Sequence, residues 1–500
     1  MKVLLVDPPM QSIMQARADW YPMGLAYLAG SAKEDGHEVL IYNGEHDPTL
    51  DYVNLTTYSS NYHLYKEALD NPRDPVWCKV RKIIEDFKPD IIGITSYSVK
   101  FPSALRIAAI AKDYNSQVPV IMGGQHVTIM TEESLSDKNI DFVVRGEGET
   151  TFIDFLHKFK QQQWNDVLGL SYKSGYQVKH NLPRPLNQDI DELPYPAREC
   201  LYDIENYETH ALAKLFASRG CPFKCNYCGT QNVWTHKFRH HGAKRIVNEI
   251  KQVKKEYGST TFTFFDDVFG LDKKYTMTLL DEMIKSNLEV KWDCLIRASI
   301  VSDELLKKMK DAGCTKIDMG VESGSDRILK HTRKGVTVKE IEKAAYLIKR
   351  SGLFLYCFFM IGLPYEREED IEMTKQFLLK IKPDWAGISI FTPIPGTGIY
   401  NELQEQGKIP DNPDYAMFSH QSPYSNFAFS MDNKEAFPEI AQDMIEFIQN
   451  YNGKYRNLFK RAMTRGYLKN PRLLISDLKK VLTWKGILKL SHQGSHSINK

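Results

Sequence analysis

Cysteines are scarce in this chain, and their placement argues against a disulfide framework. Only eight occur in 500 residues, and three of them, Cys221, Cys225 and Cys228, lie within one short stretch. This pattern indicates a reducing cytoplasm and cysteines that bind a cofactor. The five others are solitary, and we expect them to be core residues; they are Cys78, Cys200, Cys294, Cys314 and Cys357.

Long apolar runs are also missing. No stretch of eighteen apolar residues is present, so a membrane-spanning helix is not expected. The N-terminal apolar run Val3–Val6 is broken by Asp7, which indicates a buried strand and not a signal peptide. At 42% hydrophobic residues, the chain can nevertheless bury large cores and should form two or three domains.

An excess of one charge sign is missing as well, except near the C-terminus. Lysine plus arginine (65) nearly balance aspartate plus glutamate (63), which indicates neither a nucleic acid nor an acidic substrate as a partner. From Lys454 onward, however, twelve basic residues accompany one acid, Asp477. Two interpretations stay open for this tail. We favour a helix docked on the protein with a solvated basic face, and the alternative is an amphipathic helix on an anionic membrane surface.

The three clustered cysteines form the most informative motif. Three thiolates from one loop suit a [4Fe–4S] cluster, because cysteine is its usual ligand. Such a set leaves the fourth iron without a protein ligand and open to a small molecule. The alternative is a structural zinc site completed by a nearby histidine (His236, His240 or His241). We disfavour zinc because only Cys225 and Cys228 form a C-x₂-C pair.

The spacing of these cysteines, with Tyr227 before the last one, resembles the signature of the radical SAM superfamily. The resemblance implies a [4Fe–4S] cluster whose open iron chelates the amino and carboxylate groups of S-adenosylmethionine (SAM). It also implies reductive cleavage of SAM to a 5′-deoxyadenosyl radical. A second cluster would need another close group of cysteines, and the sequence contains none.

Residues 1–150 alternate strand-like apolar runs with helical patterns, which predicts an α/β domain built on a doubly wound parallel sheet. A polar or glycine-rich turn follows most of the strands. Because parallel strands end at one edge of the sheet, these turns should gather where doubly wound folds bind ligands. The expected strands are Val3–Val6, Glu38–Tyr42, Asp90–Thr95, Val118–Met122 and Phe142–Val144.

This series of turns resembles the flavodoxin-like cobalamin-binding domain that precedes the radical SAM domain in one large subfamily. The resemblance implies that the corrin lies over the strand ends. No lower axial histidine is expected, because His37 lacks the glycine of the D-x-H-x-x-G pattern and His126 is expected to form a hydrogen bond instead. The implied cobalamin contacts are Asp7, Pro8, Pro9, Ser96, Ser98, Gly123, Gly124, His126, Gly146 and Glu147.

Residues 151–205 are expected to form a hairpin, Gly169–His180, followed by a proline-rich linker. Between 206 and 410, six strands alternate with helices and predict a (β/α)₆ partial TIM-type barrel, which is the radical SAM core by resemblance. Residues 411–500 fit neither domain and are expected to be mainly helical. The six strands are Ala213–Ala217, Thr261–Phe265, Lys291–Ile296, Lys316–Met319, Phe354–Ile361 and Ala386–Phe391.

Polar residues follow the successive barrel strands, where barrel enzymes hold their ligands. The superfamily often has Gly-Gly-Glu after the second strand, whereas this chain has Phe265, Asp266 and Asp267. The resemblance implies the following SAM site: Tyr227 in the cluster motif, Asp266 or Asp267 at the methionine amino group, Arg297, Glu322 and Ser323 at the carboxylate and ribose, and Gly362, Thr392 and Pro393 at adenine.

Together these features predict a cytoplasmic radical SAM enzyme with a cobalamin domain, most consistent with methylation of an unactivated carbon or another poor nucleophile. The alternative enzyme is a radical oxidoreductase or cyclase of the anaerobic magnesium-protoporphyrin ester cyclase type. A cofactor-binding sensor is less favoured, because a sensor needs no complete SAM site. Expected partners are a small-molecule or lipid substrate and an electron donor such as flavodoxin or ferredoxin.

Overall fold

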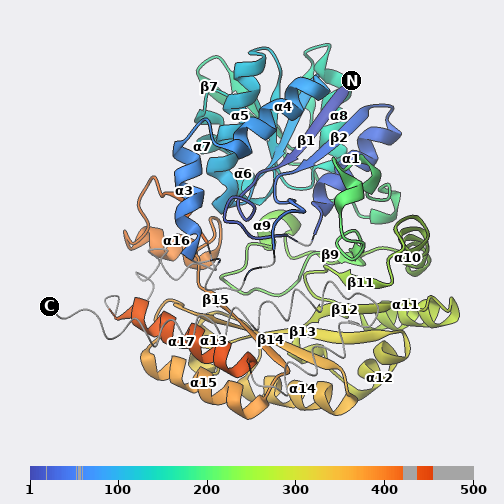
Figure 1. Cartoon of the computed structure of the whole chain (residues 1–500), viewed down its shortest axis with the longest axis vertical. Helices are drawn as coiled ribbons and strands as arrows, with labels where there is room; N and C mark the ends of the chain where they lie inside the picture. The colour runs from blue at the N-terminus through green and yellow to red at the C-terminus, as the bar shows by residue number, and fades with distance from the viewer. Residues whose placement is uncertain (19, 52, 54–57, 59, 420–435, 454–500) are drawn as a thin grey trace.

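The computed structural model of the chain describes every residue except 19, 52, 54–57, 59, 420–435 and 454–500 (Figure 1). The predicted basic tail from residue 454 onward lies outside the described residues. Within them, no helix combines the length and the apolar character needed to cross a membrane.

Seven strands form one sheet in the N-terminal domain, in the order β2-β1-β3-β4-β5-β6-β7. The first five are parallel, and β6 and β7 are antiparallel additions beside β5. The order 2-1-3-4-5 is that of flavodoxin-like folds, so the predicted doubly wound sheet is confirmed. The predicted hairpin is present as β6 and β7, and it extends this sheet. The strands are β1 (Lys2–Asp7), β2 (Glu38–Asn43), β3 (Ile91–Thr95), β4 (Val120–Gly123), β5 (Phe142–Val144), β6 (Leu170–Ser174) and β7 (Gln177–His180).

Helices cover both faces of this sheet, because successive apolar side chains along each strand point to opposite faces. Val3 and Leu5 pack with the apolar sides of α1 and α8, whereas Leu4 and Val6 pack with those of α4 and α5. The helices of this domain are α1 (Met23–Glu34), α3 (Tyr62–Asp70), α4 (Pro75–Phe87), α5 (Phe101–Tyr114), α6 (Gln125–Ile129), α7 (Thr131–Ser136) and α8 (Glu149–Phe159).

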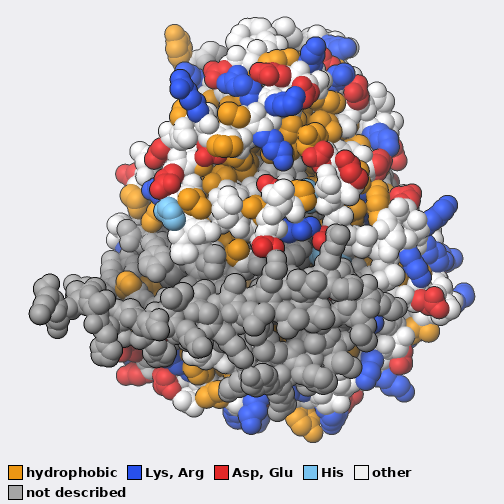
Figure 2. Space-filling view, in the orientation of Figure 1, with side chains coloured by type: hydrophobic (Ala, Val, Ile, Leu, Met, Phe, Trp, Pro, Cys, Tyr) orange, Lys and Arg blue, Asp and Glu red, His pale blue; other side chains and the backbone are white. Residues whose placement is uncertain are grey.

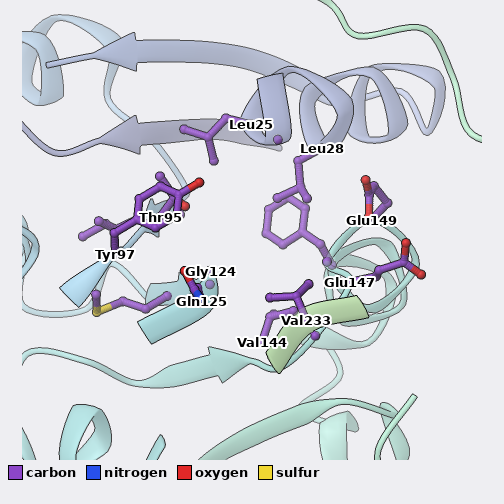
Figure 3. Close-up of a pocket in the computed structure, with 18 of the residues that line it drawn as sticks. Leu25, Leu28, Thr95, Tyr97, Gly124, Gln125, Val144, Glu147, Glu149 and Val233 are labelled. Atoms are coloured by element: carbon purple, nitrogen blue, oxygen red, sulfur yellow. The ribbon is translucent and has the colours of Figure 1, made fainter. Parts of the chain in front are cut away.

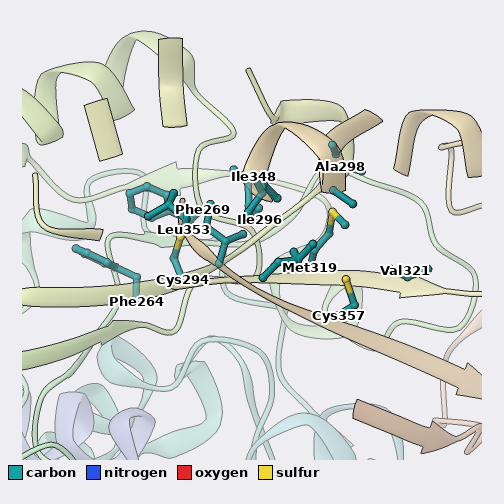
Figure 4. Close-up of a cluster of buried hydrophobic side chains, with 14 of the residues drawn as sticks. Phe264, Phe269, Cys294, Ile296, Ala298, Met319, Val321, Ile348, Leu353 and Cys357 are labelled. Carbon is teal, nitrogen blue, oxygen red and sulfur yellow. The ribbon is translucent and has the colours of Figure 1, made fainter. Parts of the chain in front are cut away.

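Six parallel strands form the second sheet, in the order β15-β14-β13-β12-β11-β8. Because neighbours in space are also neighbours in sequence, this is the predicted (β/α)₆ partial barrel. Its outer face packs against the helices through a large apolar cluster that includes Phe264, Cys294, Ile296 and Met319 (Figure 4). The strands are β8 (Lys214–Leu215), β11 (Thr261–Phe264), β12 (Lys291–Ile296), β13 (Cys314–Glu322), β14 (Phe354–Ile361) and β15 (Trp385–Ile390).

The helices of the barrel connect its strands along the chain. The last described helix, α17, packs beside β15. Asn452 on that helix fixes the contact, because its side-chain amide accepts a hydrogen bond from the N–H of Ala386 and donates one to the carbonyl of the same residue. The helices are α9 (Gln231–Trp234), α10 (Ala243–Tyr257), α11 (Lys273–Lys285), α12 (Asp303–Asp311), α13 (Asp326–His331), α14 (Val338–Ser351), α15 (Glu368–Ile381), α16 (Gly398–Glu405) and α17 (Phe437–Asn452).

The two domains pack directly on each other (Figure 1). One apolar cluster contains Met122 and Val127 of the N-terminal domain together with Met360, Phe391 and Ile399 of the C-terminal half. Between the domains lie α9 and a two-stranded ribbon of β9 (Ser218–Arg219) and β10 (Arg239–His240). The carboxyl edge of the first sheet therefore faces elements of the barrel, and this arrangement positions the site.

Surface charges of both signs are mixed (Figure 2), and most of the solitary cysteines are buried. Basic and acidic side chains are mixed over the N-terminal domain on the face drawn in Figure 2. Four of the five solitary cysteines are buried, as expected. The expectation for Cys78 was wrong: it is exposed, because α4 buries Trp77, Val80 and Ile84 on its other side.

Candidate functional site

The three cysteines lie in a loop, residues 220–238, that the β9–β10 ribbon closes at both ends. Gly220 begins the loop with φ of +88°, and a Cβ there would lie 2.0 Å from the carbonyl oxygen of Lys237. Only glycine permits this close approach. At the other side, the backbone N–H of Asn226 donates to Thr332 O at 3.2 Å, which fixes the loop against the barrel.

The thiols of Cys221, Cys225 and Cys228 are free and partly exposed, as a cluster-binding loop requires. The neighbouring histidines have other partners. His236 Nδ1 lies 3.1 Å from Phe223 O, the ring of His240 stacks on that of Tyr275, and His241 Nδ1 lies 2.9 Å from Asp191 Oδ1. The donor set therefore fits three cysteine ligands to a [4Fe–4S] cluster better than three cysteines and a histidine to zinc.

Arg297 lies beside this loop with an unsatisfied guanidinium group. Its side chain stacks on the ring of Phe223, with Cζ 3.8 Å from the centroid, and its Nη1 lies 3.9 Å from Cys225 Sγ. The residue is 7% exposed, yet its Nε and Nη2 have no hydrogen-bond partner among the described residues. Because a buried donor without an acceptor is unfavourable, this group fits an anionic ligand such as the SAM carboxylate.

Glu322 and Tyr227 meet at a lysine that the sequence did not single out. Lys334 Nζ lies 2.6 Å from Glu322 Oε1 and 3.4 Å from Tyr227 Oη, and the lysine is 7% exposed. Glu322 itself has φ of +64°, an uncommon conformation for a residue other than glycine. Lys334 follows α13 in a loop without periodicity, so the only sequence signal was its place in a Lys-Gly dipeptide.

The two neighbouring aspartates, Asp266 and Asp267, have different hydrogen-bond partners. Asp266 accepts hydrogen bonds from the Ala217 N–H at 3.1 Å and from the Ser218 hydroxyl, and burial raises its pKa to about 7. Asp267 instead accepts from the Gly220 N–H and the Thr230 hydroxyl, both at 3.1 Å, within the cluster loop. Of the two, Asp267 is thus the one that touches the cofactor-binding loop.

The remaining residues predicted to contact SAM are partly or fully buried by neighbouring side chains. Ser323 is buried, with its Oγ 3.3 Å from Thr374 Oγ1 on α15. A Cβ on Gly362 would meet the ring of Phe437 at 2.8 Å, so this glycine permits close packing against α17. Thr392 is partly exposed and Pro393 is buried after β15. The roles of these residues at the ribose and adenine remain predictions.

A cavity of about 340 Å³ lies between the first sheet and the cluster loop (Figure 3). Gly24, Gly123 and Gly146 line it, and a Cβ on Gly24 or Gly146 would meet no atom within 4 Å. Tyr97, from the turn after β3, points into the cavity and is 56% exposed. The barrel side of the wall consists of Gly229, Thr230, Val233, Trp234 and Asp267.

These glycines leave open the space that larger side chains would fill. The flat corrin of cobalamin needs such a surface, where it can approach the backbone closely. Gly123, Gly124, Gly146 and Glu147 are thereby brought together at the cavity. The residues known to line it do not include Asp7, Pro8, Pro9, Ser96, Ser98 or His126.

Asp7 and His126 are held elsewhere. Lys100 Nζ lies 2.7 Å from Asp7 Oδ1 and 2.9 Å from Glu45 Oε1, which forms a buried ion network at the end of β1. His126 Nδ1 lies 3.0 Å from Ser98 Oγ, and its ring packs between Phe101 and Tyr415. Burial lowers the pKa of His126 to about 3, so this histidine is neutral, and its hydrogen bond to cobalamin stays a prediction.

Comparison with known proteins gives two domain matches. The radical SAM superfamily matches residues 215–378, and the B12 binding domain matches residues 13–156. An uncharacterized methyltransferase of Pyrococcus horikoshii is 34% identical over 406 residues, which cover 80% of this chain and 82% of that protein. The chain belongs to the radical SAM superfamily, among members with a B12-binding domain. As a radical SAM enzyme of this kind, it uses a [4Fe–4S] cluster, SAM and cobalamin.

Two further relatives extend across the same architecture. The anaerobic magnesium-protoporphyrin IX monomethyl ester cyclase of Rubrivivax gelatinosus is 27% identical over 484 residues. The aligned region covers 94% of this chain and 79% of the cyclase. The solved structure of the radical SAM methyltransferase TsrM from Kitasatospora setae has a TM-score of 0.70 at 16% identity, with 90% of each chain covered. This structure confirms the fold of the radical SAM enzyme described here.

Proposed function

We propose that this radical SAM enzyme methylates an unactivated carbon, or another poor nucleophile, of a small molecule. The observation that supports this proposal most strongly is that one cavity wall belongs to both cofactor sites. Thr230 and Asp267 both line the cobalamin cavity. Thr230 belongs to the cluster loop and is hydrogen-bonded to Cys228, and Asp267 accepts from the N–H of Gly220 in the same loop. Two cofactors that share a wall can act on one substrate.

The cluster and SAM, when bound, supply a radical that abstracts a hydrogen atom, and cobalamin supplies the methyl group. The chain holds these groups and excludes water. Cys221, Cys225 and Cys228 would bind the cluster, and Arg297 would pair with the SAM carboxylate beside Cys225. Glycines of the first sheet would let the corrin approach the backbone. Holding reactants in the right geometry lowers the barrier, because it makes a bimolecular step effectively unimolecular.

A second candidate is a radical cyclase or oxidoreductase. Similarity to the Rubrivivax gelatinosus cyclase over 94% of this chain supports it. Methylation is preferred because the relative with 34% identity is named a methyltransferase and covers most of the chain. Either reaction needs one electron for the cluster, and we propose a small electron-transfer protein such as flavodoxin or ferredoxin as its source. A lipid substrate would follow only if the basic tail binds membranes.

The test is an anaerobic assay with methyl-deuterated SAM, hydroxocobalamin, a reductant and the candidate substrate. The proposal predicts a product that is heavier by one labelled methyl group. A product with fewer hydrogens and no label, formed together with 5′-deoxyadenosine, would replace it with the cyclase or oxidoreductase activity. The variant Cys225→Ala, which removes one cluster ligand, serves as the negative control.

A further inference from the structure

Two arginines and two glutamates form a buried ion network between the domains. Arg219 Nη1 lies 3.2 Å from Glu147 Oε1, and its Nη2 lies 2.7 Å from Glu149 Oε1. Arg239 Nη1 lies 2.8 Å from Glu147 Oε2. The four side chains are between 4% and 9% exposed, and their formal charges cancel. Because removal of one partner leaves a buried charge unpaired, the network holds together as a unit.

The arginines belong to the ribbon that frames the cluster loop. Arg219 pairs with Arg239 across β9 and β10, and Cys221 follows Arg219 after one glycine. Trp234, within the loop, contacts both guanidinium groups, whose Cζ atoms are 5.4 and 5.7 Å from its ring centroid. The position of the two arginines therefore sets the position of the loop that carries the cysteines.

The glutamates belong to the wall of the cobalamin cavity. Both line the cavity, Glu147 from the turn after β5 and Glu149 from the start of α8. Glu149 is the first residue of α8, where the helix dipole favours a carboxylate. Burial alone would raise the pKa of Glu149, but the charge and the hydrogen bond of Arg219, together with a backbone hydrogen bond and the charge of Arg239, hold the pKa below its ordinary value. The ion pair is therefore intact at neutral pH.

We propose that Arg219, Arg239, Glu147 and Glu149 are positioning residues that fix the cluster loop against the cobalamin cavity and thereby set the separation of the two cofactors. The inference rests on the proposed function, which needs both cofactors at one substrate. It gives the Gly-Glu-Gly-Glu turn a role in joining the domains, beyond the cobalamin contact expected from the sequence.

The test compares Glu147→Gln and Glu149→Gln, which remove one charge each and keep the side-chain shape. Glu249→Gln is the matched control. Glu249 forms another buried pair, with Arg198 at 2.7 Å, on α10 and away from the cavity lining. The first measurement uses enzyme loaded with cob(II)alamin and a reduced cluster, without substrate. The enhancement of cobalt spin relaxation by the cluster reports their separation. The second measures hydrogen exchange of the ribbon amides in protein without cofactors.

Both glutamate variants should change the relaxation enhancement and exchange the ribbon amides about tenfold faster, while Glu249→Gln matches the wild type in both, whatever its melting temperature. If wild-type relaxation persists in folded Glu147→Gln and Glu149→Gln, the network only stabilises the protein and the proposal fails. Should Glu149→Gln not fold, Glu147→Gln and the charge-retaining Arg239→Lys decide between these outcomes. No methyl transfer enters either measurement, so failure of the proposed function would be seen separately.

Discussion

Filling the cavity from Gly24 should separate cobalamin binding from folding. Gly24 is the second residue of α1, lines the cavity, and has open space where its Cβ would be. A phenylalanine there can turn into the cavity and cover about 150 Å² or more of apolar surface. At about 25 cal/mol per Å², cobalamin would lose about 4 kcal/mol of contact, which is a several-hundredfold weaker Kd.

The assay is a titration of the protein without cofactors with hydroxocobalamin, followed by absorbance or calorimetry. Gly24→Ala is the graded control and should bind within a few-fold of the wild type. Because Gly24 is exposed and no atom lies within 4 Å of its Cβ position, neither substitution should lower the melting temperature. Reconstituted iron should also be unchanged. Wild-type affinity in a folded Gly24→Phe variant would refute the assignment of this cavity to cobalamin.

Three further predictions concern the cluster, SAM and pH. Anaerobic reconstitution should yield about four irons and four sulfides per chain, which Cys221→Ala abolishes and Cys314→Ala retains; iron in the Cys221→Ala variant at the wild-type level would contradict the ligand set. Arg297→Met should weaken SAM binding about 10- to 150-fold, as expected for loss of about 1.5–3 kcal/mol from a charged hydrogen bond, and unchanged affinity by calorimetry would exclude the carboxylate contact. Burial raises the pKa of Glu366 from 4.5 to about 8, so the folded state binds this proton more tightly than the unfolded state. Its contribution to stability therefore falls as pH rises between these values, and Glu366→Gln should flatten the melting temperature over that range, whereas an unchanged pH profile would contradict the assignment.

The folds could be predicted because local pattern and global arrangement agree in this chain. Short apolar runs of strand length, helical patterns of period 3.6 and turns at the strand ends each indicate the same α/β layers. The cysteine loop could be predicted equally well, because its three ligands lie within eight residues of one another in the sequence. These signals involve residues close together along the chain.

Contacts between distant segments could not be predicted. Asp266 and Asp267 are equivalent in sequence, and only their partners, Ser218 and Gly220, distinguish them. Lys334 reaches Glu322 and Tyr227 from an irregular loop. Glu147 pairs with arginines more than 70 residues away, and no periodicity encodes that choice. Residue roles at the cofactors depend on such tertiary contacts.

The ratio of the two SAM-derived products tests the central claim most directly. If SAM supplies both the radical and the methyl group, wild-type enzyme should release S-adenosylhomocysteine and 5′-deoxyadenosine in equal amounts, with one methylated product each. Gly24→Phe, whose affinity for cobalamin should be several-hundredfold weaker, should release 5′-deoxyadenosine without S-adenosylhomocysteine when cobalamin is kept below that Kd. Product formation by the wild type with 5′-deoxyadenosine but no S-adenosylhomocysteine would contradict the methyltransferase account.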